Sequence, residues 1–288
     1  MGGMTIRKEF RLRLPSRAFV LGERTLVMGV LTVTPDSFSD GGRYFDPDAA
    51  AERALAMQRE GADLIDVGGE STRPGSDGVS LEEELRRVIP VLERLRGKLK
   101  IPISIDTQKA AVAEAAVGAG AELINDVSAL RTDPAVAEVA RRHRLPLILM
   151  QMRGMPRTMQ NLPFARNVMA DVSKGLREAV ARARKARVAK SQIVLDPGIG
   201  FGKNYEQNCE LLARLPELAR LGFPLLVGTS RKTFIGKLLG DVPEDKRMWG
   251  TAASVTASIL GGAHIVRVHD VAEMVQVARI ADVILKNR

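Results

Sequence analysis

The feature that most constrains the fold is a repeated alternation of short apolar runs with amphipathic segments. Strand followed by helix, eight times over, is typical of a closed parallel barrel, the (β/α)8 or TIM barrel. A doubly wound open sheet is the alternative, because periodicity does not report whether a sheet closes. The eight runs are Leu26–Leu31, Leu64–Val67, Ile103–Ile105, Leu123–Ile124, Leu147–Met150, Ile193–Leu195, Leu225–Val227 and Ile265–Val268.

The segment after the second run shows the helical pattern most clearly. Its apolar residues recur every three or four positions, at Leu81, Leu85, Val88, Leu92 and Leu95. Ser80 is placed to cap this helix, with Glu83 completing a capping box, and Gly97 to end it. Aromatic residues make up only 4% of the chain, so its core is built from aliphatic side chains, which suits parallel strands buried on both faces.

No Gly-, Ser- or Pro-rich linker divides the chain, so we expect one barrel domain over residues 26–288, preceded by an extension over residues 1–25. Within the extension, Phe10, Leu12 and Leu14 alternate with Arg11 and Arg13. This alternation predicts a short hairpin that closes the bottom of the barrel.

Composition limits the classes of function. The chain has a single cysteine, Cys209, which precludes an internal disulfide and favours a reducing cytoplasm. No apolar stretch reaches the length of a membrane span, so we expect no membrane partner. The formal charge of +9 is compatible with nucleic acid or with anionic substrates, but the sequence carries no nucleic-acid-binding signature. We therefore expect small-molecule substrates and a solvated basic surface.

Polar residues cluster where the apolar runs stop. In a barrel of this kind the carboxyl ends of the strands form the active-site face. Asp106, Asn125 and Asp196 each follow a run, and their side chains are expected to converge at the barrel mouth. Aspartate and asparagine can pair with the donor and acceptor edge of a flat heterocycle such as an aminopyrimidinone. A single aspartate at such a place is as often a helix cap, but three together predict a binding site.

A second group is cationic. Arg73, Arg267 and His269 follow strands on either side of the first, and guanidinium groups match phosphate oxygens. With the hydroxyls of Thr32 and Thr72 they are suited to hold a pyrophosphate. A third group, Ser230–Thr233, opens a predicted helix, where a carboxylate or phosphate can bind. Lys232 can instead reach inward to the heterocycle.

Seven segments taken together resemble the dihydropteroate synthase family: TPDSFSDGG, DVGGESTRPG, SIDT, IND, DPGIGFGK, GTSRK and RVHD, in that order from about residue 26 to the C-terminus. The resemblance implies a TIM barrel that joins hydroxymethyl-dihydropterin pyrophosphate to p-aminobenzoate. It also implies Mg²⁺ as a cofactor and a homodimer.

The resemblance assigns roles to individual residues. Asp106, Asn125, Asp196 and Lys232 match the pterin-binding set, with Phe201 lining the pocket. Thr72, Arg73, Arg267 and His269 match the pyrophosphate set. Phe38, Asp40 and Pro74 match the loops that shape the p-aminobenzoate site, and Thr233 matches the helix start that receives its carboxylate. The residues expected to act in the reaction itself are Asp40, Asp106, Asp196, Lys232 and Arg267.

Two positions depart from the family pattern. Thr32 stands where the family has an asparagine that supplies an oxygen to Mg²⁺, so a single hydroxyl replaces an amide carbonyl. Gln151-Met152-Arg153-Gly154 replaces the usual HMQG after the fifth run. The alternatives that we keep are a pterin-binding methyltransferase domain, which needs no pyrophosphate clamp, and a pterin-binding subunit without activity.

Overall fold

The computed structural model describes residues 7–34, 46–71, 76, 78–154, 159 and 164–287. Its main sheet has eight parallel strands in the order β8-β7-β6-β5-β4-β3-β10-β9. These strands are β3 (Leu26–Thr32), β4 (Leu64–Gly68), β5 (Ile103–Asp106), β6 (Leu123–Asp126), β7 (Leu147–Met150), β8 (Ile193–Asp196), β9 (Leu226–Val227) and β10 (Ile265–Val268).

The sheet curls into a nearly closed barrel. Its two outer strands, β8 and β9, approach through a bridge between Leu195 and Leu225, and the Leu195 amide donates to the Pro224 carbonyl over 2.9 Å. Strands that follow one another in the chain are neighbours in the sheet, and β10 returns to pair with β3. The predicted TIM barrel is therefore confirmed, and the doubly wound alternative is wrong because its sheet would not return on itself.

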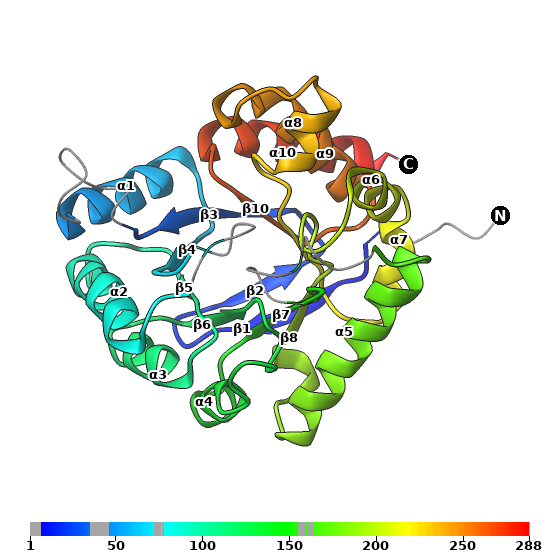
Figure 1. Ribbon diagram of the computed structural model, residues 1–288. Helices are drawn as coiled ribbons and strands as arrows, with labels where there is room; N and C mark the ends of the chain where they lie inside the picture. Colours follow the sequence, from blue (N-terminus) through cyan, green and yellow to red (C-terminus); the bar gives the residue numbers. More distant parts are fainter. Residues whose placement is uncertain are drawn as a thin grey trace.

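The helices form an outer ring around the strands (Figure 1). They are α1 (Pro47–Glu60), α2 (Leu81–Leu95), α3 (Ala110–Gly118), α4 (Val136–His143), α5 (Val168–Lys185), α6 (Tyr205–Ala213), α7 (Leu215–Ala219), α8 (Thr233–Leu238), α9 (Met248–Leu260) and α10 (Val271–Lys286), with short 3-10 turns η1 (Lys190–Gln192) and η2 (Glu244–Lys246). Asp46 caps α1 and Ser80 caps α2 through the Glu83 amide. No helix in the described part of the chain is apolar over a length that would cross a membrane.

Two apolar layers hold the barrel together. The larger lies between the sheet and the helices and is almost entirely aliphatic, as the sequence predicts. The smaller fills the bottom of the barrel with the first residues of the strands, among them Leu26, Leu64 and Ile265. Burying a side chain of this size stabilises the fold by about 1.5–3 kcal/mol. The top of the barrel is left for polar residues.

A hairpin covers the barrel bottom. Its strands β1 (Phe10–Arg13) and β2 (Ala18–Leu21) pair antiparallel, with Phe10 opposite Leu21. Leu12 and Leu21 are buried in the lower apolar layer, which is why the extension alternates apolar and basic residues. The Nδ1 atom of His264 accepts a hydrogen bond from the Leu225 amide at 3.1 Å, so this histidine is structural.

Candidate active site

Two predicted strand-end residues, Asp106 and Arg267, contact each other at the top of the barrel. Arg267, on β10, donates from Nε to Asp66 Oδ2 at 2.6 Å and from Nη2 to Asp106 Oδ2 at 2.9 Å. It thus reaches across β3 to β4 and β5. The two carboxylates outweigh the opposing effect of burial and raise the pKa of Arg267. Within the described residues its Nη1 atom has no partner, so the guanidinium keeps one donor group for a ligand.

Asp66 is the central residue that sequence reasoning did not assign to the site. It is fully buried within β4, and its Oδ2 also accepts from Asn125 Nδ2 at 2.9 Å. Its Oδ1 atom has no hydrogen-bond partner in the described structure. An aspartate inside an otherwise apolar strand was the available signal, because a buried carboxylate needs a cation or donor. Asp66 therefore holds Arg267 and Asn125 in place.

The carboxylates of the site resist ionisation. Burial, and then the nearby Asp66, raise the pKa of Asp106 to about 8, although Arg267 opposes the shift. Burial also raises the pKa of Asp196, against the charges of Lys232 and others. Asp196 Oδ1 accepts from the Gly198 amide at 2.7 Å, which fixes the carboxyl group at the end of β8. A ligand with N–H donors or positive charge would stabilise the ionised form of both groups.

Lys232 lies opposite Asp196, at the loop that follows β9. Its Nζ atom lies 4.6 Å from the centre of the Phe201 ring and donates to the Ile199 carbonyl. Burial lowers its pKa to about 8, although Asp196 acts in the opposite sense. The structure therefore brings Lys232, Phe201 and Asp196 together, and of the two roles left open for Lys232 it favours the inward one.

His269 is positioned by Ser230. The Ser230 hydroxyl lies 3.0 Å from His269 Nδ1 and accepts from the His269 amide at 3.1 Å.

Thr233 is exposed at the first position of α8, which is only six residues long. A short helix offers a correspondingly modest dipole to an anion.

A lysine bridge lies beside Asp106. The Nζ atom of Lys109 donates to Glu70 Oε2 at 2.6 Å and to Glu84 Oε2 at 2.5 Å. Glu84 is fully buried on α2, whereas Glu70 follows β4. The bridge ties the beginning of the loop after β4 to α2. No spacing in the sequence predicts that these residues pair.

Several predicted site residues cannot be placed. Phe38, Asp40, Thr72, Arg73 and Pro74 lie outside the described residues. Thr32 ends β3, half-buried and opposite Gly68. The described residues contain no group of three or more His, Cys, Asp or Glu side chains suited to a metal. Thr32 offers one hydroxyl oxygen at this strand end.

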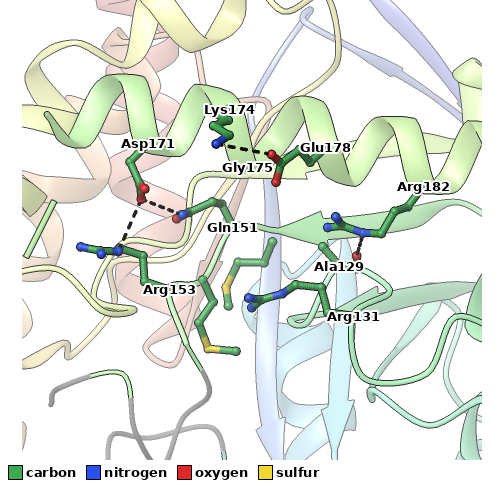
Figure 2. Close-up of a pocket in the computed structure, with 11 residues that line it drawn as sticks. Ala129, Arg131, Gln151, Arg153, Asp171, Lys174, Gly175, Glu178 and Arg182 are labelled. Atoms are coloured by element: carbon green, nitrogen blue, oxygen red, sulfur yellow. Dashed lines mark hydrogen bonds and ion pairs between the residues drawn. The ribbon is translucent and has the colours of Figure 1, made fainter. Parts of the chain in front are cut away.

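A separate cavity of about 210 Å³ lies between α5 and the loops after β6 and β7 (Figure 2). Arg131, Gln151, Arg153, Asp171 and Arg182 are among its lining residues. None of the residues predicted for substrate binding lines it. It shares with the barrel mouth only the end of β7.

The comparisons with known proteins agree with this geometry. The pterin binding enzyme family matches residues 28–269. The dihydropteroate synthase of Synechocystis is 52% identical over 264 residues, covering 92% of this chain and 91% of that one.

Solved structures show the same likeness. One is the dihydropteroate synthase of Yersinia pestis in complex with a sulfonamide drug, with a TM-score of 0.90, 44% identity and coverage of 97% of this chain and 100% of that chain. Another is the enzyme of Xanthomonas albilineans in complex with 7,8-dihydropteroate, with a TM-score of 0.86, 42% identity and coverage of 95% and 98%. The chain belongs to the dihydropteroate synthase family of pterin-binding enzymes.

Proposed function

We propose that this chain condenses 6-hydroxymethyl-7,8-dihydropterin pyrophosphate with p-aminobenzoate, giving 7,8-dihydropteroate and pyrophosphate. The observation that carries the proposal is the buried network of Asp66, Asp106 and Arg267 in the barrel mouth of this chain. Asp196 and Lys232 face this network. The chain is 52% identical to a dihydropteroate synthase. Such an arrangement supplies both acceptors for a heterocycle and a cation for its leaving group.

The pterin is proposed to lie between Asp106, Asn125 and Asp196 on one side and Lys232 and Phe201 on the other. The carboxyl groups accept from ring and amino N–H groups, while the Lys232 ammonium donates to the ring carbonyl. Phe201 packs against the flat face of the ring. These contacts explain why Asp106 and Asp196, whose pKa values burial raises, are retained in an apolar barrel.

The pyrophosphate is proposed to lie beside Arg267 Nη1 and His269, with Thr72 and Arg73 completing the clamp. p-Aminobenzoate would enter past Phe38, Asp40 and Pro74 and direct its carboxylate to Thr233. These placements follow the family resemblance for the residues outside the described part of the chain, and the geometry of Arg267 and His269 for the rest.

The proposed reaction is a dissociative substitution. The C–O bond of the pterin methylene breaks first, and pyrophosphate leaves with both electrons. The resulting cation is delocalised into the pterin ring, where ionised Asp106 and Asp196 stabilise it. The amine of p-aminobenzoate then attacks the methylene carbon and afterwards loses a proton to solvent. No nucleophilic side chain is required, so the residues contribute orientation and charge.

Mg²⁺ is proposed to accompany the pyrophosphate. Since Mg²⁺ retains water and commonly binds substrate phosphates, the single hydroxyl of Thr32 is sufficient as a protein ligand. The ion would supply neutralisation of the phosphate charge, and Arg267 and His269 would carry a larger share of that task than in relatives with asparagine at this position.

A homodimer is proposed to form through the face of α8, α9 and α10. These helices expose large apolar side chains, with Trp249 77%, Ile280 65% and Val283 60% accessible. Apolar groups gathered on neighbouring helices are typical of an interaction surface. Trp249→Glu is expected to yield a monomer in sedimentation, whereas an unchanged sedimentation coefficient would contradict this interface.

We also propose a cytoplasmic location, in keeping with the free Cys209.

The test of the activity is an assay of the purified chain with two substrate sets. Pterin pyrophosphate with p-aminobenzoate is expected to give dihydropteroate. Methyltetrahydrofolate with cobalamin is expected to give no methyl transfer. Methyl transfer would instead identify the chain as a methyltransferase domain. Pterin binding without any product would instead identify the chain as a silent subunit.

A further inference from the structure

The β8–α6 loop contains a buried lysine that the proposed reaction does not use. Lys203 is only 4% exposed, and its Nζ atom donates to three oxygens. They are Gln151 Oε1 at 2.8 Å, the Gly198 carbonyl at 2.8 Å and the Phe201 carbonyl at 3.0 Å. A buried ammonium is retained where its donors are fully used, because an unpaired charge is costly there. The three hydrogen bonds of Lys203 connect the loop to Gln151 at the end of β7 and connect two parts of the loop to each other.

The loop has a backbone path that is held from several sides. Gly198, Gly200 and Gly202 have φ values of +66°, +86° and +64°, a region that other residues rarely adopt. A Cβ atom at Gly202 would lie 2.9 Å from Arg153 Cβ, and one at Gly200 would lie 2.9 Å from Lys232 Cδ. The loop therefore fits closely between the β7 end and Lys232, and small displacements of either would move it.

Gln151 connects Lys203 to α5. Its Oε1 atom accepts from Lys203, while its Nε2 atom donates to Asp171 Oδ2 at 3.2 Å. Figure 2 shows Gln151 and Arg153 both directed at Asp171, and the Arg153–Asp171 ion pair measures 3.8 Å. Gln151 is itself 7% exposed. Both ends of its amide are thus used, which aligns its oxygen with the ammonium.

The same loop presents two groups to the proposed pterin pocket. The Phe201 ring lies under Lys232, and the Ile199 carbonyl accepts a hydrogen bond from Lys232. Lys203 binds the backbone on either side of Ile199, at Gly198 and Phe201. Its hydrogen bonds therefore determine where both pocket groups lie.

We propose that Lys203 and Gln151 are positioning residues for pterin binding, acting as a clamp that sets the β8–α6 loop against Lys232. The consequence for pterin rests on the function proposed above, whereas the clamp itself does not. The charged groups near Lys203 are Asp196 and Lys232 toward the pocket, and Asp171 and Arg153 toward α5.

Hydrogen exchange tests the clamp without any substrate. Three amides of the loop are bonded in the native state. Gly198 donates to Asp196 Oδ1 at 2.7 Å, Gly200 to Asn208 Oδ1 at 2.6 Å and Phe201 to the Gly198 carbonyl at 3.1 Å. In Lys203→Met and in Gln151→Leu, exchange in residues 198–203 should accelerate about tenfold or more. Lys185→Met, which removes an exposed lysine of α5, serves as the matched control and should leave this exchange unchanged. Wild-type exchange rates in both clamp variants would overturn the proposal.

Pterin affinity then tests the consequence, by calorimetry with the pterin alone at a temperature where each variant is folded. Gln151→Leu should weaken binding by about tenfold to a hundredfold. Gln151→His should restore it to near the wild-type value, because an imidazole again offers one acceptor and one donor. A residue that only stabilised the fold would lower the melting temperature in Gln151→Leu without moving the affinity of the folded protein, and that result would overturn the positioning role. Absence of pterin binding in the wild type would refute the proposed function instead, while the exchange experiment would still decide on the clamp.

Discussion

Replacing Arg267 by methionine should destabilise the folded protein as well as impair binding. Among the described residues, Arg267 is the one cation that contacts both Asp66 and Asp106, at 2.6 and 2.9 Å. Methionine keeps most of the side-chain volume while removing the charge. The variant would leave Asp66, which is fully buried, with Asn125 as its remaining donor.

The magnitude follows from the burial of the two partners. Removing one member of a buried ion pair costs about 3–5 kcal/mol. The Arg267 side chain is 23% exposed and Asp106 can take up a proton, so the lower end, about 3 kcal/mol, is expected at neutral pH. The loss should grow as the pH rises toward 8, because Asp106 must then ionise without its cation.

The assay is urea unfolding of Arg267→Met, Asp66→Asn and the double variant at pH 6 and pH 8. The double variant should recover much of the stability lost in Arg267→Met, since it removes the charge left unpaired. Additive losses, or a cost below about 1 kcal/mol, the value typical of exposed pairs, would refute the inference that this pair is buried and coupled.

Three further predictions concern single residues of the site. Asp196→Asn should weaken pterin binding by about 1.5–3 kcal/mol in calorimetry while the melting temperature stays near that of the wild type; unchanged affinity would contradict the assignment. The pKa of Asp106 is raised from 3.8 in the unfolded chain to about 8 in the folded protein, so the free energy of unfolding falls as the pH rises through this range. Asp106→Asn should therefore melt at a higher temperature than the wild type at pH 8 but not at pH 4. Equal melting curves at both pH values would show that Asp106 ionises freely. Thr32→Asn should lower the Mg²⁺ concentration that gives half-maximal turnover, and coincident titrations would place residue 32 away from the metal.

The fold was predictable because the strands are marked by apolar content alone. Each predicted strand was found, although β5, β6 and β8 extend to Asp106, Asp126 and Asp196. The ladder continues past the last apolar residue, because backbone pairing does not depend on side-chain polarity. Boundaries drawn from apolar runs therefore stop one or two residues early at these strands, whereas β7 and β10 end where predicted.

The meeting of Asp106 and Arg267 was predictable, because polarity changes sharply at both strand ends. The roles of the predicted site residues in binding and reaction stay predictions. Partners that lie within a strand or inside a connecting loop were not predictable, because nothing in their spacing pairs them. Asp66 and Lys203 illustrate this: each contacts residues more than 50 positions away, at Arg267, Asn125 and Gln151. Such contacts arise from barrel closure and packing.

The most direct test of the central claim is a stoichiometric turnover measurement on the wild type and Asp196→Asn in parallel. With pterin pyrophosphate and p-aminobenzoate, the wild type should form one dihydropteroate and one pyrophosphate for each p-aminobenzoate consumed. Asp196→Asn, folded but lacking the strand-end carboxylate, should form both at a rate lower by at least about a factor of ten. Equal rates in the two proteins, or no product from the wild type, would contradict the account.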